Sequence, residues 1–177
     1  MIRKLLAAVV VLCLLCCSLS ATAASGFDSS ELSYETADER DRLSNYMRDD
    51  KGLLLVNDNI TSLFRSNLKL RSYFIELLTA TVDYSLGCIE TDGKLNAESM
   101  LTFLLTSSDL VSKMAEEPIS AASLSDDELE VYRGTMNLLL NMALWASDTE
   151  TWEGEKRSTF VEALSMYLEM VCIPISR

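Results

Sequence analysis

The chain has 177 residues, with 27 Asp and Glu against 15 Lys and Arg, five Cys and no His. Its length suits one ordinary domain, and its net charge of −12 argues against nucleic acid or anionic lipid as a partner, because like charges repel. The lack of His removes the commonest general base and the commonest nitrogen ligand for zinc. With 49% hydrophobic residues, six Gly and two Pro, the composition excludes a disordered acidic tail and a collagen-like chain.

The N-terminal segment has the layout of a secretory signal peptide. A basic start at Arg3 and Lys4 precedes an apolar run over residues 5–17, and small residues follow it. The run is about 13 residues long, whereas a helix needs about 20 to cross a bilayer. We therefore predict export through a cleavable signal, cut after Ala23 or Ala24, to the periplasm or the outside of the cell. No later stretch is long enough for a transmembrane span.

Removal of this segment leaves two cysteines, Cys88 and Cys172. It also lowers the net charge from −12 to −14, because the segment contains two basic residues and no acidic one. In an oxidising compartment a cysteine pair can bond and persist. We predict a disulfide between Cys88 and Cys172 that joins the middle of the chain to its C-terminal helix. The alternative is two buried free thiols that behave as small apolar side chains.

Residues 25–36 are polar and acidic, and they predict a flexible lead-in. An amphipathic helix is expected over residues 37–50, ended by Gly52. The apolar run at 53–56 is consistent with a buried connector or a short strand.

Asn57 or Asp58 is placed to cap the next helix. Apolar residues then recur at helical spacing, which predicts one long helix up to Gly87 or two helices broken near residues 66–67. A further helix is expected after the loop at 90–94.

This further helix is capped by Asn96 and ends at Pro118. Ser125 and Glu128 form a capping box for the following helix, with Leu124 and Leu129 as a hydrophobic staple. That helix has two apolar faces and is predicted to be buried on both sides. The last helix lies within residues 155–171.

The fold class predicted from these elements is all-α, a compact bundle of about five helices after the signal peptide. No segment alternates apolar and polar residues as a strand would. The expected organisation is a signal peptide at 1–24, a lead-in at 25–36 and a single helical domain at 37–177.

The acidic loop 88–96 echoes a calcium-binding EF-hand, but Cys88 and Ser99 stand where the first and twelfth ligands belong. The carboxylate pairs are neighbours in sequence, and general acid and base work needs two that converge in a cleft. No nucleophile motif, phosphate-binding loop or Cys-x-x-Cys pair occurs. The sequence therefore predicts no catalytic residue, cofactor or metal. A glycosylation sequon at Asn59 has meaning only in a eukaryotic protein.

The most suggestive feature is a concentration of Met and aromatic residues in the last two helices. Met adapts its shape to varied apolar partners. We predict a groove for a partner protein or an apolar small molecule, lined by Met136, Met142, Trp145, Met166, Tyr167 and Met170. The favoured function is an exported binding protein without catalytic activity. The alternatives are a carboxylate-dependent hydrolase of cell-wall or glycan material, and an acidic inhibitor or structural partner of a basic protein.

Overall fold

The structure is a computed structural model that describes residues 32–91, 93, 96–117 and 124–176. The chain divides into two units, Met1–Leu32 and Ser33–Arg177. The predicted signal peptide, most of the predicted lead-in and Pro118 lie outside the described residues.

The described residues contain six α-helices and no named strand, which confirms the all-α prediction. The elements are α2 (Leu32–Ser44), α3 (Asp58–Leu63), α4 (Leu68–Glu90), α5 (Ala97–Glu116), α6 (Asp126–Ser147), the 3₁₀ turn η2 (Thr149–Trp152) and α7 (Gly154–Val171).

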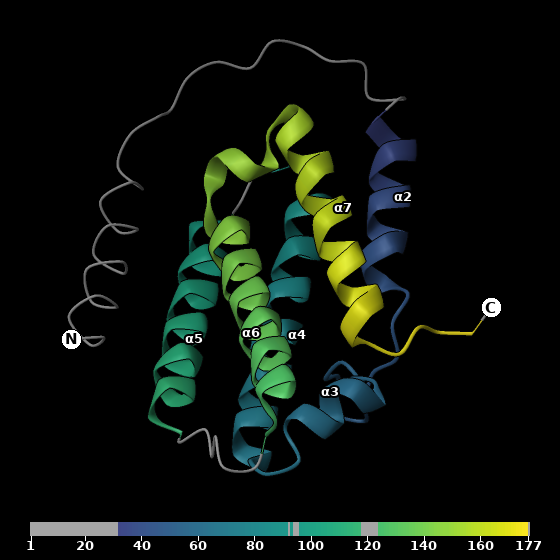
Figure 1. The fold of residues 1–177 in the computed structure, drawn as a ribbon. Helices are drawn as coiled ribbons and strands as arrows, with labels where there is room; N and C mark the ends of the chain where they lie inside the picture. The colour runs from purple at the N-terminus through teal and green to yellow at the C-terminus, as the bar shows by residue number, and fades with distance from the viewer. Residues whose placement is uncertain (1–31, 92, 94–95, 118–123, 177) are drawn as a thin grey trace. The chain divides into compact units, whose positions relative to one another are not determined.

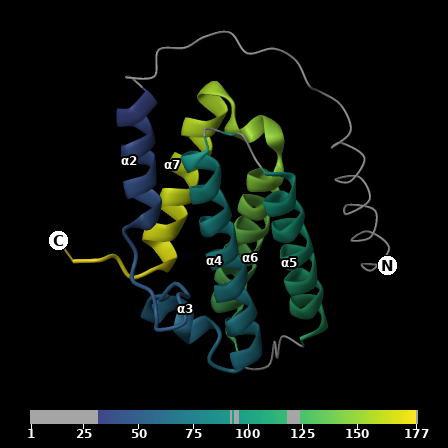
Figure 2. The same cartoon turned by 180° about the vertical axis from the view of Figure 1, so that it is seen from behind.

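Helix α4 is the central element of the bundle and contacts both α5 and α6. Figure 1 shows α6 in front of α4, with α5 on one side of α6 and α7 on the other. From behind, α4 lies in front and α2 runs along the side of α7 (Figure 2). The largest fully buried side chains come from these helices and their connections: Phe64, Phe74, Leu77, Leu78, Leu139, Phe160, Leu164 and Leu168.

Asparagine side chains cap the starts of α3, α4 and α5. The Asn57 side chain accepts from the Ile60 amide at 3.2 Å, and the Asn67 side chain accepts from the Leu70 amide at 2.9 Å. The break predicted near residues 66–67 is therefore confirmed, because Asn67 starts a new helix. The predicted cap at Asn96 is present as well.

Ser125 and Glu128 form the predicted capping box, with the Ser125 amide donating to the Glu128 carboxylate at 2.8 Å. The same hydrogen bonds hold the pKa of Glu128 below its usual value. Each side chain thus satisfies a backbone donor that the first turn of α6 leaves unpaired.

The helix predicted over residues 37–50 is wrong at both ends, since α2 begins at Leu32 and ends at Ser44. The next residues are extended and form isolated β-bridges, Tyr46 with Pro174 and Val56 with Cys172. The amide of Met47 donates to the carbonyl of Ile173 at 2.9 Å. Backbone partners distant in sequence therefore override the local helical pattern.

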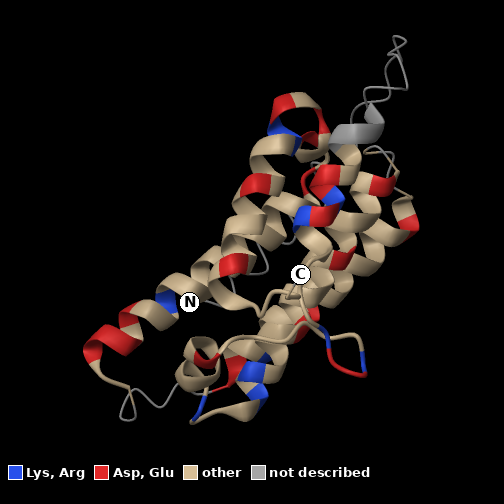
Figure 3. Ribbon diagram, turned by 90° about the vertical axis from the view of Figure 1, so that its right-hand side faces the viewer, with Lys and Arg blue, Asp and Glu red and all other residues tan. Residues whose placement is uncertain are grey.

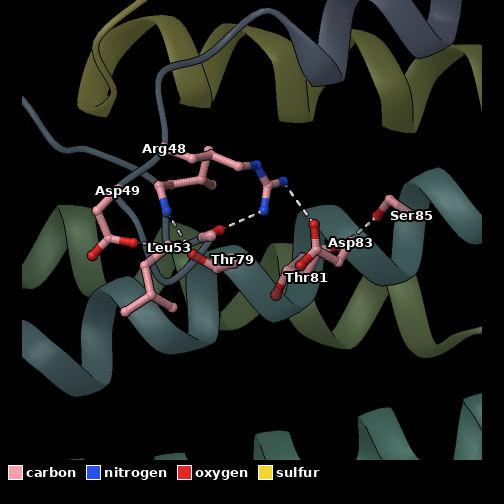
Figure 4. Close-up of polar contacts among 9 residues, drawn as sticks. Arg48, Asp49, Leu53, Thr79, Thr81, Asp83 and Ser85 are labelled. Carbon is pink, nitrogen blue, oxygen red and sulfur yellow. Dashed lines mark hydrogen bonds and ion pairs between the residues drawn. The ribbon is translucent and has the colours of Figure 1, made fainter.

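Side chains attach this extended connector to α4. The Arg48 guanidinium donates to the Gly52 carbonyl at 2.8 Å and to the Asp83 carboxylate at 2.7 Å (Figure 4). The Leu54 amide donates to the Thr79 hydroxyl at 3.1 Å. Gly52 has a φ of 82°, a conformation that favours glycine, so the chain can reverse there.

The two cysteines lie far apart and are both free and buried, which corrects the predicted disulfide. Cys88 lies inside α4, close enough to Arg157 in the first turns of α7 for the guanidinium to influence its pKa. Cys172 caps the other end of α7, on the order of 20 Å further along at 1.5 Å per residue. A disulfide needs Cα atoms within about 7 Å. The structure therefore agrees with the alternative prediction, in which Cys88 and Cys172 are buried free thiols.

Candidate functional site

The six residues predicted to line a groove divide between the core and the surface. Met142 and Tyr167 are buried, and the Tyr167 hydroxyl donates to the Thr135 carbonyl at 2.8 Å. Burial raises the pKa of Tyr167, so its hydroxyl stays protonated and keeps donating. Trp145, partly buried, meets Phe160 edge-on with ring centroids 5.2 Å apart. These residues hold α6 against α7.

Met136 is partly buried against the core, whereas Met166 and Met170 extend into solvent. Their exposed fractions are 64% and 49%, and they lie one turn apart on α7. The structure therefore brings only these two of the six residues together on an open surface.

Two exposed residues of α6 lie beside them. The hydrogen bond between Tyr167 and Thr135 fixes the relative level of the two helices. Val131 lies one turn before Thr135, and Leu138 lies about one turn after it. Both are exposed, and helical spacing directs them toward the same side of the α6–α7 contact as the two methionines. We call Val131, Leu138, Met166 and Met170 the α6–α7 stripe.

Carboxylates border this stripe. Glu162 and Glu169 lie one turn before and one turn after Met166 and are exposed. On α6, exposed Asp127 lies one turn before Val131. The stripe thus combines an apolar centre with a negative rim, as protein-binding surfaces commonly combine an apolar core and a polar rim.

A cleft of about 400 Å³ lies between α4 and α5, and none of the residues predicted to line a groove lines it. Its apolar lining includes Tyr84 and Phe103, which are buried and stacked with ring centroids 4.2 Å apart. Asn96, Glu98 and Thr106 form part of its polar side. Because the two rings stack on each other, the faces that they share are closed to a ligand.

The carboxylates of the described residues are spread over several helices (Figure 3). The Lys156 ammonium pairs with Glu150 and lowers the pKa of that carboxyl. In the described part of the chain, no group of three or more His, Cys, Asp and Glu could hold a metal ion. Within the same part, every helix is too short or too polar to cross a membrane.

Comparisons with protein-family models, curated proteins and solved structures find no match for this chain. The sequence reasoning missed Val131, Leu101, Leu105 and Leu144, all exposed on α5 or α6. For Leu144 a usable signal was present, because residues 134–147 contain no charged residue although 24% of the chain is charged.

Proposed function

We propose that the protein is exported and acts by binding a partner at the α6–α7 stripe, without catalysing a reaction. The observation that carries this proposal is the exposure of Met166 and Met170, one turn apart, beside two exposed apolar residues of α6. Exposed Met side chains adapt to varied apolar surfaces, which suits a binding role. The basic, apolar and small-residue succession at 1–24 supports export.

The rim of the stripe favours a partner of particular chemistry. Asp127, Glu162 and Glu169 attract positive charge, and the chain as a whole is acidic. The partner class that fits is an amphipathic helix with an apolar face flanked by Lys or Arg. An apolar small molecule fits less well, because such ligands favour enclosed pockets over an open stripe.

A model peptide tests this proposal without knowledge of the natural partner. The probe is a labelled amphipathic helix of Leu and Lys, about 15 residues long, and the readout is fluorescence anisotropy. We expect Met166→Glu and Met170→Glu to weaken binding at least about tenfold, because each places a charge in the apolar centre. Leu68→Glu is the matched control, since Leu68 is 63% exposed on α4 and lies outside the stripe.

Two further measurements complete the test. Binding should weaken as salt is added, and a Leu and Glu peptide of the same length should bind less tightly, because the rim is negative. Failure of the native protein to bind the Leu and Lys peptide, or equal binding by the Met166→Glu variant, would contradict the proposal. The N-terminal residue of the exported protein, read by mass spectrometry, tests the predicted cleavage after Ala23 or Ala24.

A further inference from the structure

The sulfur atoms of the chain divide between the core and the surface. Beyond the predicted signal peptide the sequence has seven methionines and two cysteines, and all of them lie in the described residues. Three are exposed methionines, Met47, Met166 and Met170. The other six sulfur-containing side chains are buried or pack against the core: Cys88, Cys172, Met100, Met114, Met136 and Met142.

Two of the three exposed methionines form the centre of the α6–α7 stripe. Met166 and Met170 are 64% and 49% exposed and lie one turn apart on α7. Met47 is 43% exposed and belongs to the extended connector, where its amide donates to the Ile173 carbonyl. An oxidant in solution therefore reaches the sulfur atoms of the stripe before those of the core.

We propose that Met166 and Met170 are an oxidation site, and that their conversion to methionine sulfoxide switches off binding at the α6–α7 stripe. This inference rests on the binding role proposed for the stripe. The oxidant class is a neutral peroxide, of which hydrogen peroxide is the simplest. Each thioether sulfur takes one oxygen atom from a peroxide molecule, whose O–O bond breaks, and one water molecule is released. The sulfur is oxidised and the peroxide is reduced, so the step needs no other reactant.

The charge around the two methionines favours a neutral oxidant over an anionic one. Exposed Glu162 and Glu169 lie about one turn before and one turn after Met166. The chain as a whole has a net charge of −12. An anion such as peroxymonosulfate is repelled by this field, whereas hydrogen peroxide carries no charge and reaches the sulfur atoms without that cost.

Oxidation changes the surface of α7 and leaves the contacts that hold the helix in place. Tyr167 and Leu168 are buried, and the Met170 carbonyl accepts from the Asn57 side chain at 2.8 Å. None of these anchors uses a methionine sulfur atom. The sulfoxide is polar, so covering it with the apolar face of a partner helix would bury a hydrogen-bond acceptor without a donor. Binding should therefore weaken while the fold persists.

Peptide mapping by mass spectrometry tests the selectivity of oxidation without any partner. The folded native protein is treated with hydrogen peroxide, and each methionine is followed over time. We expect Met166 and Met170 to gain oxygen at least about tenfold faster than Met114 and Met142, each of which is 8% exposed. In urea the four rates should become similar, because unfolding removes the protection. Equal rates in the folded protein would overturn the proposal.

Fluorescence anisotropy with the Leu and Lys peptide tests the effect on binding, and each variant is compared with itself before peroxide. Oxidation of the native protein should weaken binding at least about tenfold, and methionine sulfoxide reductases for both epimers should restore it. In the double variant Met166→Leu, Met170→Leu the stripe is apolar but holds no sulfur, so peroxide should change binding less than about twofold. Met47→Leu is the matched control, and its binding should fall as in the native protein.

The outcomes separate this inference from the proposed function. Equal binding before and after oxidation of both methionines would overturn the switch and leave the stripe as a binding surface. A native protein that never binds the peptide would overturn both proposals. A loss of binding that persists in the double variant, disappears in Met47→Leu, or accompanies a loss of helix by circular dichroism would also overturn the switch.

Discussion

The ion pair between Glu39 and Arg157 fastens α2 to the start of α7, and Glu39→Gln should loosen that attachment. Arg157 Nε donates to a Glu39 carboxylate oxygen at 2.8 Å, and a second guanidinium nitrogen lies 2.6 Å from the same oxygen. The two side chains are only 10% and 12% exposed. Among residues 36–44, Leu43 alone is fully buried. The pair therefore supplies a large share of what holds α2 in place.

The expected cost follows from the burial of the pair. Removing one partner of a buried ion pair costs about 3–5 kcal/mol, because the other charge stays in a nearly dry site. A detached α2 would let water reach Arg157 and would forfeit mainly the burial of Leu43, about 2 kcal/mol, together with the pair itself. We therefore expect Glu39→Gln to lower the free energy of unfolding by about 3 kcal/mol. For a chain of this size that lowers Tm by about 6–12 °C.

Urea denaturation followed by circular dichroism measures this loss, and a double-mutant cycle with Arg157→Met isolates the pair. The double variant should be more stable than the sum of the single losses predicts, by at least about 1 kcal/mol. Asp38→Asn is the control, because Asp38 pairs with Arg42 in an exposed contact that should contribute less than about 0.5 kcal/mol. A Glu39→Gln protein within about 0.5 kcal/mol of the native protein would refute the reasoning.

Two further predictions concern the capping box and the thiols. Ser125→Ala should destabilise the protein by about 1 kcal/mol in urea, because the first turn of α6 loses its cap. The capping box lowers the pKa of Glu128 below its ordinary value of 4.5. The stabilisation that comes from the ionised Glu128 carboxylate is therefore complete above pH 4.5 and is lost as pH falls through the lower pKa of the folded state. The effect of Ser125→Ala on stability should consequently shrink in acid. A stability difference that is the same at pH 3 and pH 7 would contradict this. Cys88 and Cys172 should resist a thiol reagent in the native state, because burial raises the pKa of each to about 12 and leaves about a thousandfold less thiolate than at the ordinary value of 9. Both should react fully after unfolding without reductant, and a disulfide-linked peptide would contradict the free thiols.

The parts of the fold that the sequence predicts correctly are those decided by nearby residues. Asn57, Asn67 and Ser125 each accept from an amide within three residues, so their helix starts can be read locally. The end of α2 and the fate of the cysteines depend on distant contacts. Tyr46 is extended because it pairs with Pro174, more than a hundred residues away, and no local pattern contains that information.

Two of the six residues predicted to line a groove, Met166 and Met170, belong to the exposed stripe, and the other four do not. The concentration of Met and aromatic residues in the last two helices placed Met166 and Met170 in the predicted groove, but composition could not fix which side of each helix meets the core. That choice depends on contacts between helices, such as the hydrogen bond from Tyr167 to Thr135. Met142 and Tyr167 are consequently core residues, although they share the composition of the predicted groove.

Helix α6 contributes two of the four residues of the proposed binding surface. Its two apolar faces predict burial on both sides, yet Leu138 and Leu144 are exposed on different sides of the helix. The contacts of α6 with α4, α5 and α7 cover its buried residues and leave these two leucines in solvent. Part of the apolar surface of α6 is thus left in water. Covering it with another molecule is favourable, because this removes apolar surface from water. The carboxylates that border the stripe then favour a basic helix as the partner that covers Leu138.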